Sequence, residues 1–147
     1  MDNSLTTYEV KELAYYWYKK LTDHSPVEEL LDLVSADDDL FIEFPDCPIK
    51  NESEFRNWYK DVCNKFFDEQ HIIHLLDIKL DGDHAKVKII VNWQTKTWDP
   101  PAAYSKWEGY YVHQDWVVKK DIKRGKAVIV RYVVGEFDSF KRKSEVQ

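Results

Sequence analysis

The chain has 147 residues, of which 44% are hydrophobic and 33% are charged, and its formal net charge at pH 7 is −6. A chain of this length can form one domain with a single core, and its negative charge disfavours a nucleic-acid surface, which needs clustered lysine and arginine. No apolar run approaches the ~20 residues of a membrane span, and the first residues lack a signal-peptide pattern. Cys47 and Cys63 do not make a disulfide framework, so we expect free thiols and a cytoplasmic protein.

Capping signals mark the starts of three helices. Thr6, Ser25 and Asn51 are each followed three residues later by a glutamate, and Pro26 suits the first position of the second helix. Apolar residues then recur every three or four positions, which predicts helices over about 7–21, 26–34 and 52–68. The inward faces of the first and third helices are Val10, Leu13, Ala14, Trp17, Leu21, Phe55, Trp58, Tyr59, Val62 and Phe66.

The apolar period changes to two in the second half of the chain, which is typical of strands. A short strand is expected at 40–44, and four long strands at about 71–80, 84–98, 105–119 and 126–134. Helices grouped early and strands grouped late predict an α+β fold with a curved antiparallel sheet. We expect one domain over residues 1–147, with a core over about 6–135 and a C-terminal tail over 136–147.

Large residues occupy both faces of the last two long strands. A sheet with one face in water should alternate cleanly between apolar and polar residues. This sheet does not, so we predict a homodimer that pairs through the outer sheet face. The residues assigned to the outer face are Trp107, Tyr111, His113, Val117, Ile129 and Arg131, and those opposite them are Tyr110, Val112, Trp116, Val130 and Tyr132.

Aromatic residues make up 15% of the chain, including six tryptophans and nine tyrosines. Aromatic walls with a few polar groups are typical of small-ligand pockets. If the inward faces of the helices and strands meet, we expect one cavity between them. Its walls would be Trp17, Trp58, Trp93, Trp116 and Tyr132, with Gln114 as a polar group. Ordinary core packing of the same residues is the alternative.

Several short motifs add a family resemblance over about residues 6 to 135. They include Trp17-Tyr18-x-x-Leu21-x-x-His24-x-Pro26, Phe66-Phe67-Asp68-Glu69-x-His71, Val91-Asn92-Trp93-Gln94, Gln114-x-Trp116 and Val130-Arg131-Tyr132-x-Val134. In these motifs and in element order the chain resembles the nuclear transport factor 2-like superfamily, in particular a bacterial SnoaL-like group whose motifs carry no known catalysis. The resemblance implies a cone in which the sheet curls around the first helix and leaves a pocket at the open end.

The resemblance also suggests residues for chemistry. Isomerase and cyclase relatives use an acid near the pocket as general base, for which Glu43 and Asp46 are the candidates, although surface roles are the alternative. Tyr18 would bond a developing oxyanion, and His71 would move a proton. A structural role is the alternative for both, and His24 is interpreted as a residue at the helix end.

These observations predict a protein that binds a small apolar or aromatic metabolite. An acid–base isomerase, cyclase or dehydratase is one interpretation, and a non-catalytic binding or dimerisation module is the other. We expect no metal and no cofactor, because the histidines are not at ligand spacing with a pair of carboxylates.

Overall fold

The computed structural model describes residues 4–45 and 47–141. Three helices and six strands occur in this part of the chain. In chain order they are α1 (Thr7–Asp23), α2 (Val27–Leu31), β1 (Phe41–Phe44), β2 (Cys47–Ile49), α3 (Glu52–Lys65), β3 (Phe67–Asp81), β4 (His84–Thr97), β5 (Lys106–Asp121) and β6 (Lys126–Phe140).

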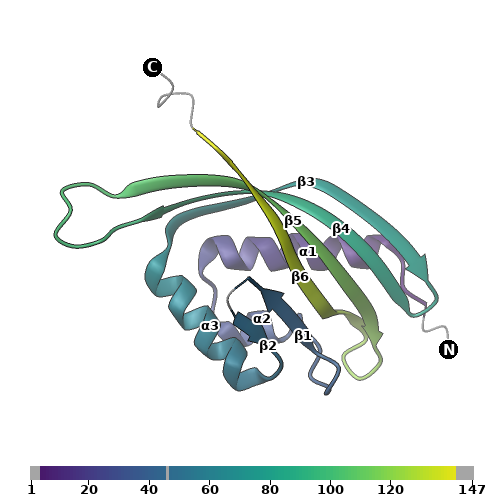
Figure 1. Ribbon diagram of the computed structural model, residues 1–147. Coiled ribbons are helices and arrows are strands. Elements are labelled where there is room, and N and C mark those ends of the chain that lie inside the picture. Colours follow the sequence, from purple (N-terminus) through teal and green to yellow (C-terminus); the bar gives the residue numbers. More distant parts are fainter. Residues whose placement is uncertain (1–3, 46, 142–147) are drawn as a thin grey trace.

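The strands form one sheet in the order β2-β1-β6-β5-β4-β3. The four long strands β3 to β6 pair as antiparallel neighbours, and β1 pairs in parallel with β6. Figure 1 shows these long strands curving over α1, with α3 and the β1–β2 hairpin near one end of that helix. The predicted α+β fold with a curved sheet of antiparallel long strands is confirmed.

Local capping explains two of the three helix starts. The Thr6 side chain accepts from the Glu9 amide at 3.2 Å while Glu9 bonds back to Thr6, which completes the capping box that the sequence predicts. Asn51 Oδ1 likewise accepts from the Glu54 amide at 2.9 Å. The predicted capping box at Ser25 is wrong, because α2 begins at Val27 and its cap residue Pro26 has no side-chain donor or acceptor.

A layer of fully buried side chains fills the space between α1 and the sheet. Trp17 of α1 and Trp116 of β5 meet edge to face, with ring centroids 6.3 Å apart. Phe55 of α3 packs against Trp17 at 6.2 Å. Each such side chain contributes about 1.5–3 kcal/mol through burial. This packed layer fixes α1 under the sheet.

The bounds of several elements differ from the prediction. Helix α3 ends at Lys65 and β3 already starts at Phe67, where Asp68 takes a left-handed conformation (φ 50°) at an irregularity in the pairing with β4. Strand β6 continues to Phe140, so part of the predicted tail is sheet. A short strand, β2, was not predicted.

A register shift also separates two halves of β6. Val118 pairs with Ile129 and Val117 pairs with Arg131, which leaves Val130 as an extra residue. Ile129 and Tyr132 are therefore both buried, although strict alternation assigned them to opposite faces. The prediction that Ile129 lies on the outer face is wrong.

Candidate functional site

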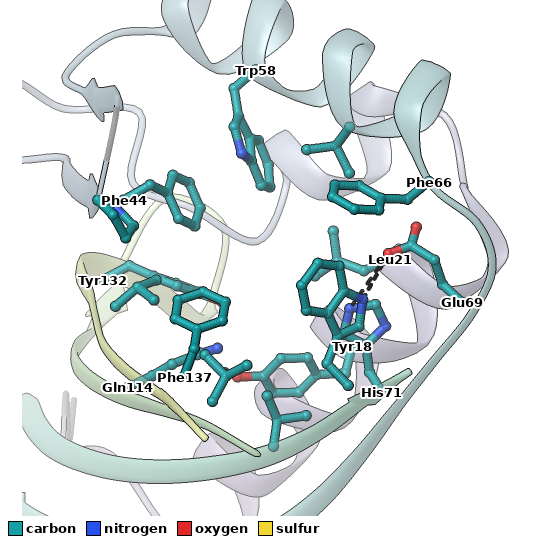
Figure 2. A pocket seen from close by; sticks show the side chains of 16 residues that line it. Tyr18, Leu21, Phe44, Trp58, Phe66, Glu69, His71, Gln114, Tyr132 and Phe137 are labelled. Atoms are coloured by element: carbon teal, nitrogen blue, oxygen red, sulfur yellow. Dashed lines mark hydrogen bonds and ion pairs between the residues drawn. The ribbon is translucent and has the colours of Figure 1, made fainter. Parts of the chain in front are cut away.

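A cavity of about 290 Å³ lies between α1, α3 and the inner face of the sheet. Figure 2 shows α3 above it and the strands below. Its volume is about twice the ~150 Å³ of a cavity that holds benzene, so a one- or two-ring compound fits. The lining residues are Tyr18, Leu21, Phe44, Pro45, Trp58, Val62, Phe66, Glu69, His71, Val91, Trp93, Val112, Gln114, Tyr132, Val134 and Phe137.

Aromatic rings form much of the cavity wall. Phe44 of β1 stacks on Trp58 of α3 with centroids 4.7 Å apart. Phe66 and Phe137 each meet Trp93 edge to face. Phe137 remains 41% exposed, so it lies at the rim, and the deeper walls are aliphatic and aromatic. An apolar or aromatic ligand body suits these walls.

One end of the cavity is polar through Gln114, which we call the amide end. Tyr18 Oη donates to Gln114 Oε1 at 2.5 Å, and Trp116 Nε1 donates to the same oxygen at 3.2 Å. Since an indole nitrogen can only donate, the amide atom that faces it must be the oxygen. The Gln114 nitrogen, with two N–H donors, is therefore the other side of the amide, and it interacts with the Tyr132 hydroxyl.

Two phenols accompany Gln114 at the amide end. Burial raises the pKa of Tyr132 to about 12, and burial together with the neighbouring Tyr132 hydroxyl holds the pKa of Tyr18 well above its usual range. Both hydroxyls are thus protonated at neutral pH. The amide end consists of neutral groups that can donate hydrogen bonds.

The other end of the cavity is built around a buried carboxylate, and we call it the carboxylate end. Trp93 Nε1 donates to Glu69 Oε1 at 2.9 Å, and His24 Nε2 is bonded to Glu69 Oε2. The Glu69 side chain is only 2% exposed, whereas that of His24 is 28% exposed. Glu69 thus lines the cavity while its partner His24 reaches solvent. Figure 2 shows Glu69 and His71 across the cavity from Gln114.

His71 lies beside this carboxylate. Its Nε2 is 4.0 Å from Glu69 Oε1, and its Nδ1 is 3.0 Å from the Thr22 hydroxyl. The imidazole stacks between Tyr18 and Trp93, with centroids 5.8 and 6.2 Å away. Burial, and secondly the nearby His24, lowers the pKa of His71 to about 3. His71 is consequently uncharged at neutral pH.

The structure brings together six of the ten residues that the sequence suggested for the site. Tyr18, Trp58, His71, Trp93, Gln114 and Tyr132 all line the cavity. Trp17 and Trp116 do not line it, because they are fully buried in the packed layer beneath it. Glu43 is exposed, since it alternates with the buried Ile42 on β1. Asp46 lies outside the described residues.

The sequence interpretation missed Glu69. It falls between the predicted end of the third helix at 68 and the predicted start of the strand at 71. The signal that could have found it is strand alternation, since a residue two positions before His71 shares its face. His24 was interpreted only as a helix-end residue. It does cap α1, in a left-handed conformation with φ 50°, but it also bonds the site carboxylate.

One group of possible metal ligands occurs in the described part of the chain, and none of its residues lines the cavity. Ligand atoms of His113, Glu136 and Asp138 lie within 4.8 Å of one another, although we expected no such spacing. His113 Nε2 and Asp138 Oδ2 form a hydrogen bond at 2.9 Å, which accounts for the closeness of these two side chains. No helix among the described residues has the length and apolarity to cross a membrane.

Comparisons with solved structures identify the fold of this chain. No protein-family profile and no curated protein matches the chain. A provisionally assigned aromatic ring hydroxylase from Novosphingobium aromaticivorans superposes with a TM-score of 0.75 at 13% identity, covering 90% of this chain and 92% of that one. A provisionally assigned scytalone dehydratase from the same organism gives 0.74 at 14% identity, covering 92% and 88%.

A provisionally assigned dehydratase of the NTF2-like family from Streptomyces avermitilis gives a TM-score of 0.72 at 15% identity, covering 86% of this chain and 93% of that one. At these identities the likeness concerns the fold and not the reaction. The narrower SnoaL-like assignment stays a prediction. The chain has the nuclear transport factor 2-like fold, as its motifs and element order predicted.

Proposed function

We propose that the cavity binds a small, largely apolar or aromatic molecule and that the Glu69–His71 pair exchanges a proton with it. The observation that carries this proposal is the convergence of an aromatic-walled cavity, the Gln114 amide donor at one end and a buried carboxylate at the other. The provisional dehydratase assignments of two proteins with this fold agree with proton-transfer chemistry, by analogy only.

The geometry suits abstraction of a proton next to a carbonyl group. The carbonyl oxygen would accept from the Gln114 amide and the Tyr132 hydroxyl, which stabilise the negative charge that develops on it. The C–H electron pair moves into the new C=C bond, the C=O pair moves to oxygen, and the proton goes to the Glu69–His71 pair. Return of the proton at another carbon gives an isomerisation, and loss of a β-hydroxyl as water gives a dehydration.

Binding is tested with a variant that fills the cavity. Val134 lines it, and Val133 beside it faces the opposite side of β6. Native mass spectrometry against a library of one- and two-ring ketones and phenols should give complexes with the wild type. Val134→Trp should abolish these complexes, and Val133→Trp should retain them. Equal binding by both variants would contradict the proposed site.

A second candidate function is binding without catalysis. The low pKa of His71, about 3, favours it, because such an imidazole is a weak base at neutral pH. Hydrogen–deuterium exchange at the carbon next to a bound ketone, followed by NMR, separates the two functions. Exchange that Glu69→Gln or His71→Gln abolishes supports catalysis, and binding without any exchange supports the binding module.

We also propose that the outer sheet face pairs two copies of the chain. Trp107, Tyr111 and Val117 are only partly buried within one copy, and Ile72 of β3 is 53% exposed. Burial of such residues against a second sheet would stabilise a dimer. Light scattering should give a dimer at micromolar concentration, and Val117→Lys should reduce it to a monomer. A monomeric wild type would refute the pairing.

A further inference from the structure

The two polar ends of the cavity have opposite hydrogen-bonding character. Gln114 Oε1 already accepts from Tyr18 and Trp116, which occupy both of its lone-pair directions. Only the N–H donors of this amide remain for a ligand. The amide end therefore needs a ligand atom that accepts.

The carboxylate end presents acceptors. Each oxygen of Glu69 contacts one donor, Trp93 Nε1 or His24 Nε2, and each has a second lone-pair direction. The 4.0 Å between Glu69 Oε1 and His71 Nε2 is too long for a direct hydrogen bond. A ligand hydroxyl placed beside both atoms would donate to the carboxylate and accept from the imidazole N–H. This end therefore needs a ligand atom that donates.

The Tyr18 ring separates the two ends. Its hydroxyl contacts Gln114, and its ring stacks against His71 with centroids 5.8 Å apart. A ligand that reaches both ends must span about one ring, with its apolar body against the aromatic wall. An added ionic group would be buried without a partner of opposite charge at the amide end, which is costly.

We propose that the natural ligand is an uncharged one- or two-ring compound with a carbonyl oxygen at one end and a hydroxyl group at the other. The carbonyl oxygen lies on the Gln114 amide, and the hydroxyl lies between Glu69 and His71. This assignment rests on the proposed function, because it names the ligand class of the same cavity.

Four probes of one skeleton test this assignment: 6-hydroxy-1-tetralone, 1-tetralone, 5,6,7,8-tetrahydro-2-naphthol and tetralin. Dissociation constants are measured by isothermal titration calorimetry, with tryptophan fluorescence for the weaker probes. The hydroxyketone should bind tightest, and each probe that lacks one group should bind about tenfold more weakly, the loss expected for one hydrogen bond in a buried site.

Exchanging the polarity of the amide end should change this order. Gln114→Glu keeps the oxygen that Tyr18 and Trp116 contact and replaces the N–H donors with an anionic oxygen. It should weaken 1-tetralone about tenfold and leave tetrahydro-2-naphthol unchanged or tighter. Gln94→Glu is the matched control, because Gln94 bonds Asn92 and does not line the cavity.

The carboxylate end has a matched pair of its own. Glu69→Gln should weaken tetrahydro-2-naphthol about fivefold, because a charge-assisted hydrogen bond becomes a neutral one, and should leave 1-tetralone unchanged. Glu108→Gln is the control, since Glu108 contacts Tyr110 and does not line the cavity.

The outcomes separate the two proposals. If tetralin binds as tightly as the hydroxyketone, the cavity binds ligands but the polarity assignment is wrong. If the preference for the carbonyl survives Gln114→Glu, the assignment of the carbonyl to that end is wrong. If none of the four probes binds at millimolar concentration, the proposed pocket function fails, and the ligand class fails with it.

Discussion

The packed layer and the cavity wall are built from the same residue types and behave differently. In the packed layer, Trp17, Phe55 and Trp116 are at most 1% exposed, and Trp17 meets each of the other two edge to face. In the cavity wall, Trp58 and Trp93 are only partly buried, and each borders the cavity. A tryptophan on an inward face stabilises the fold where neighbours surround it, and lines a pocket where they do not.

Stability should therefore respond unequally to the removal of these rings. Trp17→Ala is expected to lower the free energy of unfolding by about 3–5 kcal/mol, because it leaves a large cavity in the packed layer. Trp58→Ala should cost about 1–2 kcal/mol, since its ring already borders open space. Urea denaturation of both variants measures the difference. Equal losses would mean that the two regions are packed alike.

Acid should destabilise the folded protein through His71, at the carboxylate end of the cavity. Its pKa is about 3 in the fold against an ordinary value of 6.5, so the unfolded chain binds the proton more readily. The free energy of unfolding is therefore highest above pH 6.5, where His71 is neutral in both states, and it decreases as the pH falls toward 3. At pH 5 the loss is about 2 kcal/mol.

The control for this pH effect is His71→Gln, which should flatten that part of the pH dependence. His24 and Glu69 are present beside residue 71 in both proteins, so the difference between wild type and variant reports His71 itself. Urea unfolding at pH 7.5 and pH 5 gives the change in the free energy of unfolding with pH for each protein. A variant as acid-sensitive as the wild type would show that His71 is not the group responsible.

A smaller loss of stability is expected at Tyr18, whose ring stacks on Trp116 of the packed layer and whose hydroxyl bonds Gln114 in the cavity wall. Tyr18→Phe removes the donor to Gln114 Oε1 and should lower the free energy of unfolding by about 1 kcal/mol. Tyr15→Phe on the same helix is the control, and it should change little because Tyr15 is 58% exposed. Thermal unfolding of the pair measures this. The interpretation of Tyr18 as a link between layer and cavity fails if both changes are equally mild.

The rim should affect binding more than folding. Phe137→Ala is expected to cost less than about 1 kcal/mol of stability, because the ring is 41% exposed. It should weaken a bound two-ring ligand several-fold, since the ring also packs against Trp93 and Tyr110 at the cavity. Phe140→Ala, whose ring contacts Trp107 and Tyr111, is the control for titration calorimetry. Unchanged affinity in Phe137→Ala would place the ligand elsewhere.

The sequence predicted the fold more completely than the site. Periodicity places Trp17 and Trp58 on inward faces, but it contains no information on how many neighbours each ring meets. The depth of a side chain depends on how the sheet curves over α1, which is a property of the whole chain. Trp17 was therefore expected in the cavity wall, and the structure places it in the packed layer.

Irregular backbone accounts for other differences. The pairing of β3 with β4 is irregular around the left-handed Asp68, and β3 starts before the predicted position, so that it includes Glu69. An extra residue at Val130 puts Ile129 and Tyr132 on the same buried face. Strict alternation cannot predict such shifts, because one inserted residue reverses the assignment of every side chain beyond it.

The central claim is that the cavity wall, and not the packed layer or the outer surface, meets the ligand. The indole N–H signals of the tryptophans in a ¹⁵N–¹H spectrum, assigned by single substitutions, test it during titration with 6-hydroxy-1-tetralone. The signals of Trp93, whose N–H bonds Glu69, and of Trp58 should move furthest, and that of the exposed Trp98 should stay in place. Saturable movement at Trp98 with fixed Trp58 and Trp93 signals would contradict the account.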